Sequence, residues 1–169
     1  MDILIRSERP TDQDAIEKVT VQAFAGKPYS NRTEHLIVNA LRDAAALSLS
    51  LVAEVHEEVA GHIGFSLVTI NGKAVDWYGI GPVSVAPKYQ LQGVGSKLVQ
   101  EGLTRIREAG AKGCVLEGSP QYYGRFGFKA YAGLIYEGSP APEYFMALPF
   151  YEEVPQGKVN FHPSFYISP

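Results

Sequence analysis

The sequence predicts a single α/β domain over residues 1–169, built on a mixed, mostly antiparallel sheet with helices on both faces. Residues 49–68 alternate apolar and polar side chains around a short turn, as an antiparallel hairpin does. Residues 83–98 have the pattern of a strand, a glycine-bearing turn and the start of a helix. A chain of 169 residues that is 46% hydrophobic is long enough to bury one sizeable core.

Composition excludes several classes of protein. The net charge of −3 offers no electrostatic basis for nucleic-acid binding. No apolar run reaches membrane-spanning length, and the N-terminus lacks the layout of a signal peptide, so we expect a cytoplasmic protein that binds no membrane. Cys114 is the sole cysteine, which argues against an internal disulfide and a cysteine metal cluster. Ten tyrosines and eight phenylalanines indicate either an aromatic-lined cleft or a bulky core.

The N-terminal third is expected to hold one strand and two helices. Residues 3–6 form a short strand, and a helix follows from Pro10, with Thr11 or Asp12 as its cap. That helix stops at the Gly26-Lys27-Pro28 turn. A second helix begins near residues 31–34 and carries an apolar stripe.

The middle of the chain is expected to be a long strand with an irregular centre. Asn71-Gly72 is a strong hairpin turn signal and leads into a strand over residues 74–85. Gly79, Gly81 and Pro82 interrupt this strand, and glycine within a strand often marks a bulge or a close backbone approach.

The remaining elements follow the glycine-bearing turn. A helix over residues 94–109 connects the long strand to a strand at 112–117, so these two strands should be parallel. A short helix at 121–126 comes next. Residues 127–130 should lead into a further strand, 143–148 should form the last clear one, and 155–169 should pack as an irregular arm.

The turn between the long strand and its helix is the main functional signal. Val83 and Val85 alternate as strand residues do, and Pro87 ends the ladder because it has no N–H. Gly93 and Gly95 allow another backbone or a ligand to approach closely. Unpaired N–H groups at a helix N-terminus favour phosphate binding, although an ordinary tight turn would show some of the same pattern.

The order Val-x-Val-x-Pro-x-x-Gln-x-x-Gly-x-Gly resembles the acetyl-CoA-binding motif of the GNAT superfamily of N-acetyltransferases. A Walker loop would need Gly-Lys-Ser/Thr, which is absent, and a dinucleotide fingerprint would need a third glycine where Leu98 stands. The resemblance implies that acetyl-CoA is the co-substrate, with its pyrophosphate held by backbone N–H groups. The residues implied in cofactor binding are Val83, Ser84, Val85, Gln90, Leu91, Gln92, Gly93, Val94, Gly95 and Ser96.

A second motif supports the same family. Residues 122–128 resemble its aromatic-Tyr-x-x-aliphatic-Gly-Phe segment, and the cofactor-binding core would span about 76–130. The resemblance implies a sheet of six to seven strands that splays between the fourth and fifth, where the pantetheine arm pairs with the backbone of Val83 and Val85. The tail resembles a bacterial subgroup of predicted N-acetyltransferases.

The reaction determines which side chains are needed. The amine must be neutral to attack, and the leaving thiolate needs a proton. By motif position Tyr123 is the candidate general acid, with a core or rim tyrosine as the alternative. Many family members carry a glutamate base where this chain has Gly79. Asp76, Tyr78 and Glu117 are substitutes, each of which is also compatible with a non-catalytic role, and an acceptor that is already partly neutral would need no base.

We therefore expect direct transfer of an acetyl group to a primary amine of a small molecule or protein, without a metal. Cys114 lies in an apolar strand, where burial makes a thiol inert, so an acyl-enzyme is not expected. One alternative is a CoA-binding regulatory or partner module without efficient turnover. Another is a preference for longer or succinyl-like acyl groups, set by the pocket near Tyr78 and Val83. Dimers are common in the resembled family, so a homodimer is compatible with the sequence.

Overall fold

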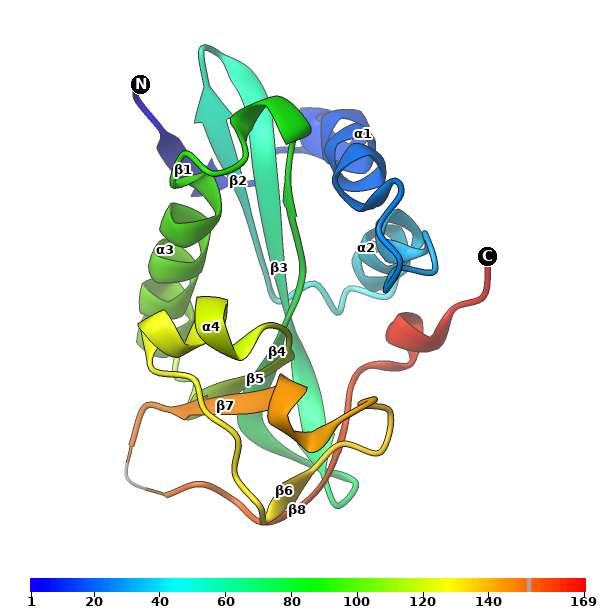
Figure 1. Cartoon of the computed structure of the whole chain (residues 1–169), viewed down its shortest axis with the longest axis vertical. Helices are drawn as coiled ribbons and strands as arrows, with labels where there is room; N and C mark the ends of the chain where they lie inside the picture. The colour runs from blue at the N-terminus through cyan, green and yellow to red at the C-terminus, as the bar shows by residue number, and fades with distance from the viewer. Residues whose placement is uncertain (152) are drawn as a thin grey trace.

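The computed structural model describes residues 1–151 and 153–169. Eight strands form one sheet, whose main path runs β1-β2-β3-β4-β5-β7 (Figure 1). The strands are β1 (Leu4–Ser7), β2 (Leu49–Val55), β3 (Glu58–Ile70), β4 (Lys73–Val85), β5 (Gly113–Glu117), β6 (Leu134–Ile135), β7 (Phe145–Pro149) and β8 (Gly157–Asn160). The helices are α1 (Gln13–Phe24), α2 (Glu34–Asp43), α3 (Val94–Glu108) and α4 (Pro120–Tyr123). Along the main path only β4 and β5 are parallel, which confirms the predicted mixed, mostly antiparallel sheet.

β3 and β4 are the longest strands and form a hairpin at the centre of the sheet. Asn71 and Gly72 connect its strands with φ values of 52° and 78°, the left-handed pair that a two-residue hairpin turn requires. The register shifts where Ile63 and Phe65 face Val83 and Ile80, because β4 has one extra residue there. This bulge confirms the irregularity predicted for the middle of the long strand.

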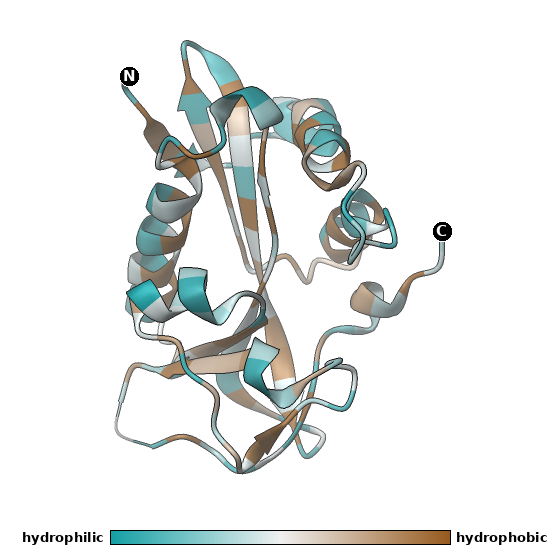
Figure 2. Ribbon diagram, in the orientation of Figure 1, coloured by the Kyte–Doolittle hydropathy of each residue, from teal (hydrophilic) through white to brown (hydrophobic). Residues whose placement is uncertain are grey.

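Helices cover both faces of the sheet, as predicted. Leu51 and Ala53 of β2 belong to the core cluster under α3, whereas Val52 packs with Ile16 of α1 and Val38 of α2. Successive strand residues point to opposite faces, so α3 and the α1–α2 pair lie on opposite sides. In Figure 1, α3 lies to the left of the long strands, and α1 and α2 lie to the right. Figure 2 shows that hydrophobic and hydrophilic residues alternate along α3.

The C-terminal region corrects two predictions. The arm is not irregular throughout, because β8 pairs with Thr69 and Ile70 at the end of β3. The partner of β3 on that side, β2, begins opposite Phe65, so β8 occupies an edge that β2 leaves open. The strand expected after residues 127–130 is reduced to one bridge, Lys129 with Ala147, and to the two-residue β6. The sheet therefore has eight strands rather than six or seven.

The start of α1 also differs from the prediction. The Asp12 side chain does not cap α1. Its carboxylate accepts hydrogen bonds from the Arg9 backbone N–H at 2.6 Å and from the Arg6 guanidinium at 2.7 Å. The hydrogen bond from Arg6 lowers the pKa of Asp12. Asp12 therefore ties the preceding loop to β1.

A polar network lies under α2. His62 is fully buried, and its Nε2 is 2.8 Å from the Ser50 hydroxyl. Ser50 donates to Glu8 at 2.9 Å, and Glu8 is paired with Arg42 at 2.6 Å. Burial lowers the pKa of His62 to about 4, so the ring is neutral at pH 7.

No helix among the described residues is long and apolar enough to cross a membrane.

Candidate active site

After a short parallel contact β4 and β5 diverge, and we call this opening the fork. The parallel pairing covers residues 77–79 of β4 and 113–115 of β5. Beyond it β4 continues to Val85 alongside β3, while β5 continues to Glu117 alongside β7. The two strands separate in Figure 1, with α4 lying beside the opening. The expected splay between the fourth and fifth strands is thus present.

The edge of β4 that faces the fork has backbone groups that pair with no other strand. The N–H of Ala86 donates to Ala60 of β3 at 2.8 Å. Because backbone groups alternate in direction along a strand, Ser84 also faces β3. The N–H and C=O groups of Val83 and Val85 therefore face the fork, which is the orientation that pairing with an extended ligand would need.

At the end of this edge, a helix N-terminus is presented. Gly93 has φ 89° and directly precedes α3, and its carbonyl accepts the first helical hydrogen bond, from Lys97 at 3.1 Å. The three N–H groups before Lys97 therefore have no acceptor within the helix, and they belong to Val94, Gly95 and Ser96. The Gln90 side chain donates to the Val85 carbonyl at 3.0 Å and holds the turn against β4.

Three of the predicted cofactor residues direct their side chains elsewhere. The Ser84 hydroxyl is buried and donates to Thr20 of α1 at 3.3 Å. The Gln92 amide donates to the Lys88 carbonyl at 2.9 Å. Leu91 is fully exposed at the tip of the turn, with φ 60°. These residues shape the turn, and they present no free polar side-chain group to the fork.

The segment after β5 packs against the first turn of α3. The Tyr122 hydroxyl lies 2.9 Å from where a Cβ on Gly95 would stand. Arg125, in the short 3₁₀ turn η3 (Gly124–Phe126), stacks over the Tyr122 ring with 4.5 Å to its centroid and donates to the Ser96 hydroxyl at 3.1 Å. Gly95 therefore has space only for a hydrogen, and Arg125 adds positive charge at a helix end that already favours anions.

Tyr123 lies beside the fork, at the end of α4. Its ring contacts those of Tyr122 at 4.9 Å, Phe128 at 6.1 Å and Phe126 at 6.4 Å between centroids. Burial, with contributions from Tyr122 and Tyr29, raises the pKa of the Tyr123 phenol. The phenol is therefore protonated at neutral pH, as a general acid must be.

The three candidate bases differ in position. Asp76 lies before the paired segment, where its carbonyl accepts from the Lys112 N–H at 2.8 Å, so it is at the closed end of the fork. Tyr78 packs against the core cluster under α3, and burial, Asp76 and Cys114 raise its pKa. Glu117 is exposed at the open end of the fork.

At Gly79 there is no space for any side chain. A Cβ there would stand 2.6 Å from the Phe161 ring and 3.1 Å from Val68. Phe161 comes from the C-terminal arm, directly after β8, and is 7% exposed. Where the resembled motif has a glutamate, this chain has an aromatic ring supplied by another part of the sequence.

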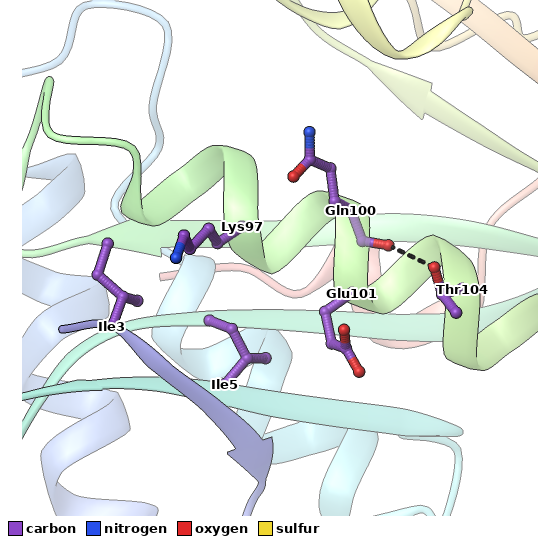
Figure 3. Close-up of a pocket in the computed structure, with 6 residues that line it drawn as sticks. All are labelled: Ile3, Ile5, Lys97, Gln100, Glu101 and Thr104. Carbon is purple, nitrogen blue, oxygen red and sulfur yellow. Dashed lines mark hydrogen bonds between the residues drawn. The ribbon is translucent and has the colours of Figure 1, made fainter.

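Two concave regions lie outside this arrangement. One, of about 360 Å³, lies between the N-terminal strand and α3 (Figure 3) and is lined by Ile3, Ile5, Lys97, Gln100, Glu101 and Thr104. The other, of about 460 Å³, adjoins the Glu8–Arg42 pair. Neither region is lined by a predicted cofactor residue or by Tyr123.

Sequence reasoning missed three residues of this region. Arg125 stands inside the second motif, but only the structure shows that it reaches Ser96. Tyr29 lies in the α1–α2 loop, and its effect on Tyr123 has no sequence signal. The contact of Phe161 had an indirect sequence signal in Gly79, because a glycine in the middle of a buried strand indicates that another group lies against it.

Comparison with known proteins identifies the family. The model of the acetyltransferase (GNAT) domain matches residues 5–131. The curated protein YhbS of Escherichia coli, named as an uncharacterized N-acetyltransferase, is 37% identical over 128 residues, which are 75% of this chain and 74% of YhbS.

Two crystal structures are similar over nearly the whole chain. A GNAT family acetyltransferase from Brucella melitensis, in complex with acetyl-CoA, is 50% identical, with a TM-score of 0.87 over 97% of this chain and 98% of that one. YhbS from Escherichia coli, in complex with CoA, is 32% identical, with a TM-score of 0.90 over 98% of this chain and 92% of that one. The family match and these relatives show that the chain belongs to the GNAT family of acetyltransferases.

Proposed function

We propose that this protein transfers an acetyl group from acetyl-CoA to a primary amine by direct attack of the amine on the thioester. The observation that carries the proposal is the fork, which combines a strand edge that no other strand covers, a helix N-terminus and a protonated phenol. We take residues 1–169 as one N-acetyltransferase domain, with its cofactor-binding core at about 76–130. The complexes of the similar proteins with acetyl-CoA and CoA support this choice of co-substrate.

Each part of the fork has a role in this proposal. The backbone groups of Val83 and Val85 pair with the amide groups of the pantetheine arm. The N–H groups from Gly93 to Ser96 bind the pyrophosphate, aided by the helix dipole. Gln90, Leu91 and Gln92 set the shape of this turn, and Ser84 fixes the strand against α1.

Tyr123 completes the site as the general acid. The attacking amine forms a bond to the thioester carbonyl carbon, and the carbon–sulfur bond then breaks. The phenol of Tyr123 gives its proton to the departing sulfur, so that no free thiolate is released beside the aromatic rings that surround Tyr123. Its raised pKa keeps this proton in place until transfer.

The first test is thermal unfolding with acetyl-CoA, CoA, ATP and NAD. A ligand at about 100 times its Kd adds roughly 2.7 kcal/mol of stability, which for a chain of this size raises Tm by about 5–10 °C. We expect that rise with acetyl-CoA and CoA and none with NAD. No rise with acetyl-CoA in folded protein would refute the proposal.

A matched pair of variants locates the ligand. Gly95→Asp places a side chain against the Tyr122 hydroxyl and a negative charge at the helix N-terminus, so it should abolish the rise in Tm. Gln100→Asp adds the same charge on the exposed side of α3 and should retain the rise. Retained binding in Gly95→Asp would remove the turn from the site.

A second candidate is a CoA-binding module without efficient turnover. It is favoured by the Phe161 ring over Gly79, which leaves this part of β4 without a carboxylate. Release of CoA thiol in the presence of primary amines separates the two functions. Stabilisation by acetyl-CoA without any thiol release would favour the second candidate.

A further inference from the structure

The face of the fork opposite Tyr123 is covered by an aromatic wall, defined here as Tyr136, Phe145, Phe161 and Phe165. The Phe161 ring is central to it, with its centroid 5.0 Å from that of Tyr136, 5.0 Å from that of Phe165 and 6.3 Å from that of Phe145. Tyr136 also contacts Phe145 at 5.3 Å. All four residues of this wall follow the proposed cofactor-binding core in the sequence.

The aromatic wall extends from one strand of the fork to the other. On the β4 side, Phe161 lies against Gly79, and Phe165 approaches to 3.9 Å from where a Cβ on Gly81 would stand. Phe165 belongs to the 3₁₀ turn η5 (Pro163–Tyr166), which packs against α2. On the β5 side, Phe145 is paired directly with Glu117. The wall therefore extends from Gly79, the last residue of β4 that is paired with β5, to Glu117 at the end of β5.

Glu117 stands at the edge of this wall with its carboxylate unpaired. It lies two residues beyond the last β4–β5 pair, and alternation along β5 places its side chain on the same face as the buried Val115, which packs in the wall's own cluster. The pKa of Tyr136 is raised mainly by burial, then by Tyr166, and to a smaller extent by the charge of Glu117. Among the described residues Glu117 has no ion-pair partner.

Tyr123 and Glu117 lie on opposite faces of β5. The Tyr123 ring lies 2.5 Å from where a Cβ on Gly118 would stand. It is on the same face of β5 as Leu116, which belongs to the core cluster under α3. Glu117 points to the other face because neighbouring strand residues alternate. A thioester between the strands would thus have a proton donor on one side and a carboxylate on the other.

We propose that Glu117 and the aromatic wall form the acceptor site, and that its substrate is a cationic primary amine carried on an apolar or aromatic body. The inference rests on the proposed function. A carboxylate beside aromatic rings suits an ammonium group attached to apolar carbon, because the charge pairs with Glu117 while the body packs against the wall. Two exposed tyrosines lie nearby: Tyr166 of η5 is hydrogen-bonded to Tyr136, and Tyr29 of the α1–α2 loop is close enough to contribute to the raised pKa of Tyr123.

In this proposal Glu117 acts as the general base that accepts a proton from the acceptor amine. The ammonium group gives one proton to the Glu117 carboxylate and becomes nucleophilic. After it bonds to the acetyl carbon, the nitrogen loses a second proton, which replaces the one that Tyr123 gives to sulfur. Glu117 then releases its proton to water, so each turnover yields one amide, one CoA thiol and one proton.

The test compares two amines on purified full-length protein. Phenethylamine is charged at pH 7.5, whereas aniline is neutral. We expect Glu117→Gln to lower kcat/KM for phenethylamine by about 10²-fold and to change the value for aniline by much less. Glu108→Gln, an exposed acid at the end of α3, is the matched control and should change neither. Stabilisation by acetyl-CoA should be the same in all three proteins.

The outcomes separate this inference from the function on which it rests. Equal losses for both amines, or no loss for phenethylamine, would overturn the role of Glu117 while acetyl transfer by the wild type stands. No thiol release by the wild type with any amine, despite stabilisation by acetyl-CoA, would refute both. Phe165→Ala should further reduce the preference for phenethylamine over ethylamine, and an unchanged preference would remove the wall from acceptor binding.

Discussion

Gly79→Ala tests the close contact between β4 and the C-terminal arm. The added methyl group would lie 2.6 Å from the Phe161 ring, well inside normal carbon contact. Neither the backbone at Gly79 nor the Phe161 ring can shift to relieve this contact. Gly79 is paired with Ser66 on one side and with Val115 on the other, and Phe161 is enclosed by the other rings of the aromatic wall.

The size of the effect follows from two opposing terms. Overpacking a core position costs about 1–3 kcal/mol. Replacing glycine by alanine also restricts the unfolded chain, which returns about 0.4–1 kcal/mol. A net loss of about 1–2 kcal/mol lowers Tm by roughly 2–8 °C in a domain of this size. Gly79→Glu should be worse, because a longer, charged side chain would enter the same occupied space.

The measurement is thermal unfolding of a double-mutant cycle with Phe161→Ala. Removing the ring costs about 3–5 kcal/mol by itself, and in that background Gly79→Ala should cost little more. Gly124→Ala is the matched control, because its φ is −57° and nothing lies within 4 Å of the added methyl. A wild-type Tm for Gly79→Ala, or the same loss with and without the ring, would refute the reasoning.

Three other predictions concern single side chains. Tyr123→Phe should lower kcat by about 10²-fold with little change in stabilisation by acetyl-CoA, while Tyr151→Phe, an exposed tyrosine, should retain full activity; full activity in Tyr123→Phe would remove the phenol from the mechanism. Because the folded pKa of His62 is depressed to about 4, the unfolded chain binds the extra proton first, and stability should fall as pH drops from about 6.5 to 4, by up to about 3 kcal/mol. Unfolding at several pH values should show this fall in the wild type and a smaller one in His62→Gln. Burial raises the pKa of the Cys114 thiol, so iodoacetamide should label unfolded but not native protein, and rapid labelling of active enzyme would reopen an acyl-enzyme route.

The strand, turn and helix from Val83 to α3 could be predicted from the sequence because their signals are local. Val83 and Val85, the glycines of the turn and the apolar spacing of α3 all lie within one short stretch, where periodicity and turn chemistry determine the structure. The parallel direction of β5 followed from the helix that precedes it, and the antiparallel pairing of β3 with β4 followed from the Asn71-Gly72 turn.

The structure of the C-terminal arm was less predictable because its contacts join distant segments. The pairing of β8 with β3 connects residues about 90 positions apart, and short edge strands such as Gly157–Asn160 carry little periodicity. The same applies to Phe161 against Gly79. Asp12 was one of two candidate caps, with Thr11, but its carboxylate instead accepts hydrogen bonds from the Arg6 guanidinium and the Arg9 N–H.

The position of Phe161 has a consequence for how the protein is made. A nascent chain that has emerged as far as Phe128 already contains the turn before α3 and Tyr123, but it lacks β7, β8 and every residue of the aromatic wall. Gly79 then has one face open to water until the last segment arrives. The strand, turn and helix around Gly93 are thus complete early in synthesis, whereas the aromatic cover over Gly79 forms only after Phe161 and Phe165 have been added.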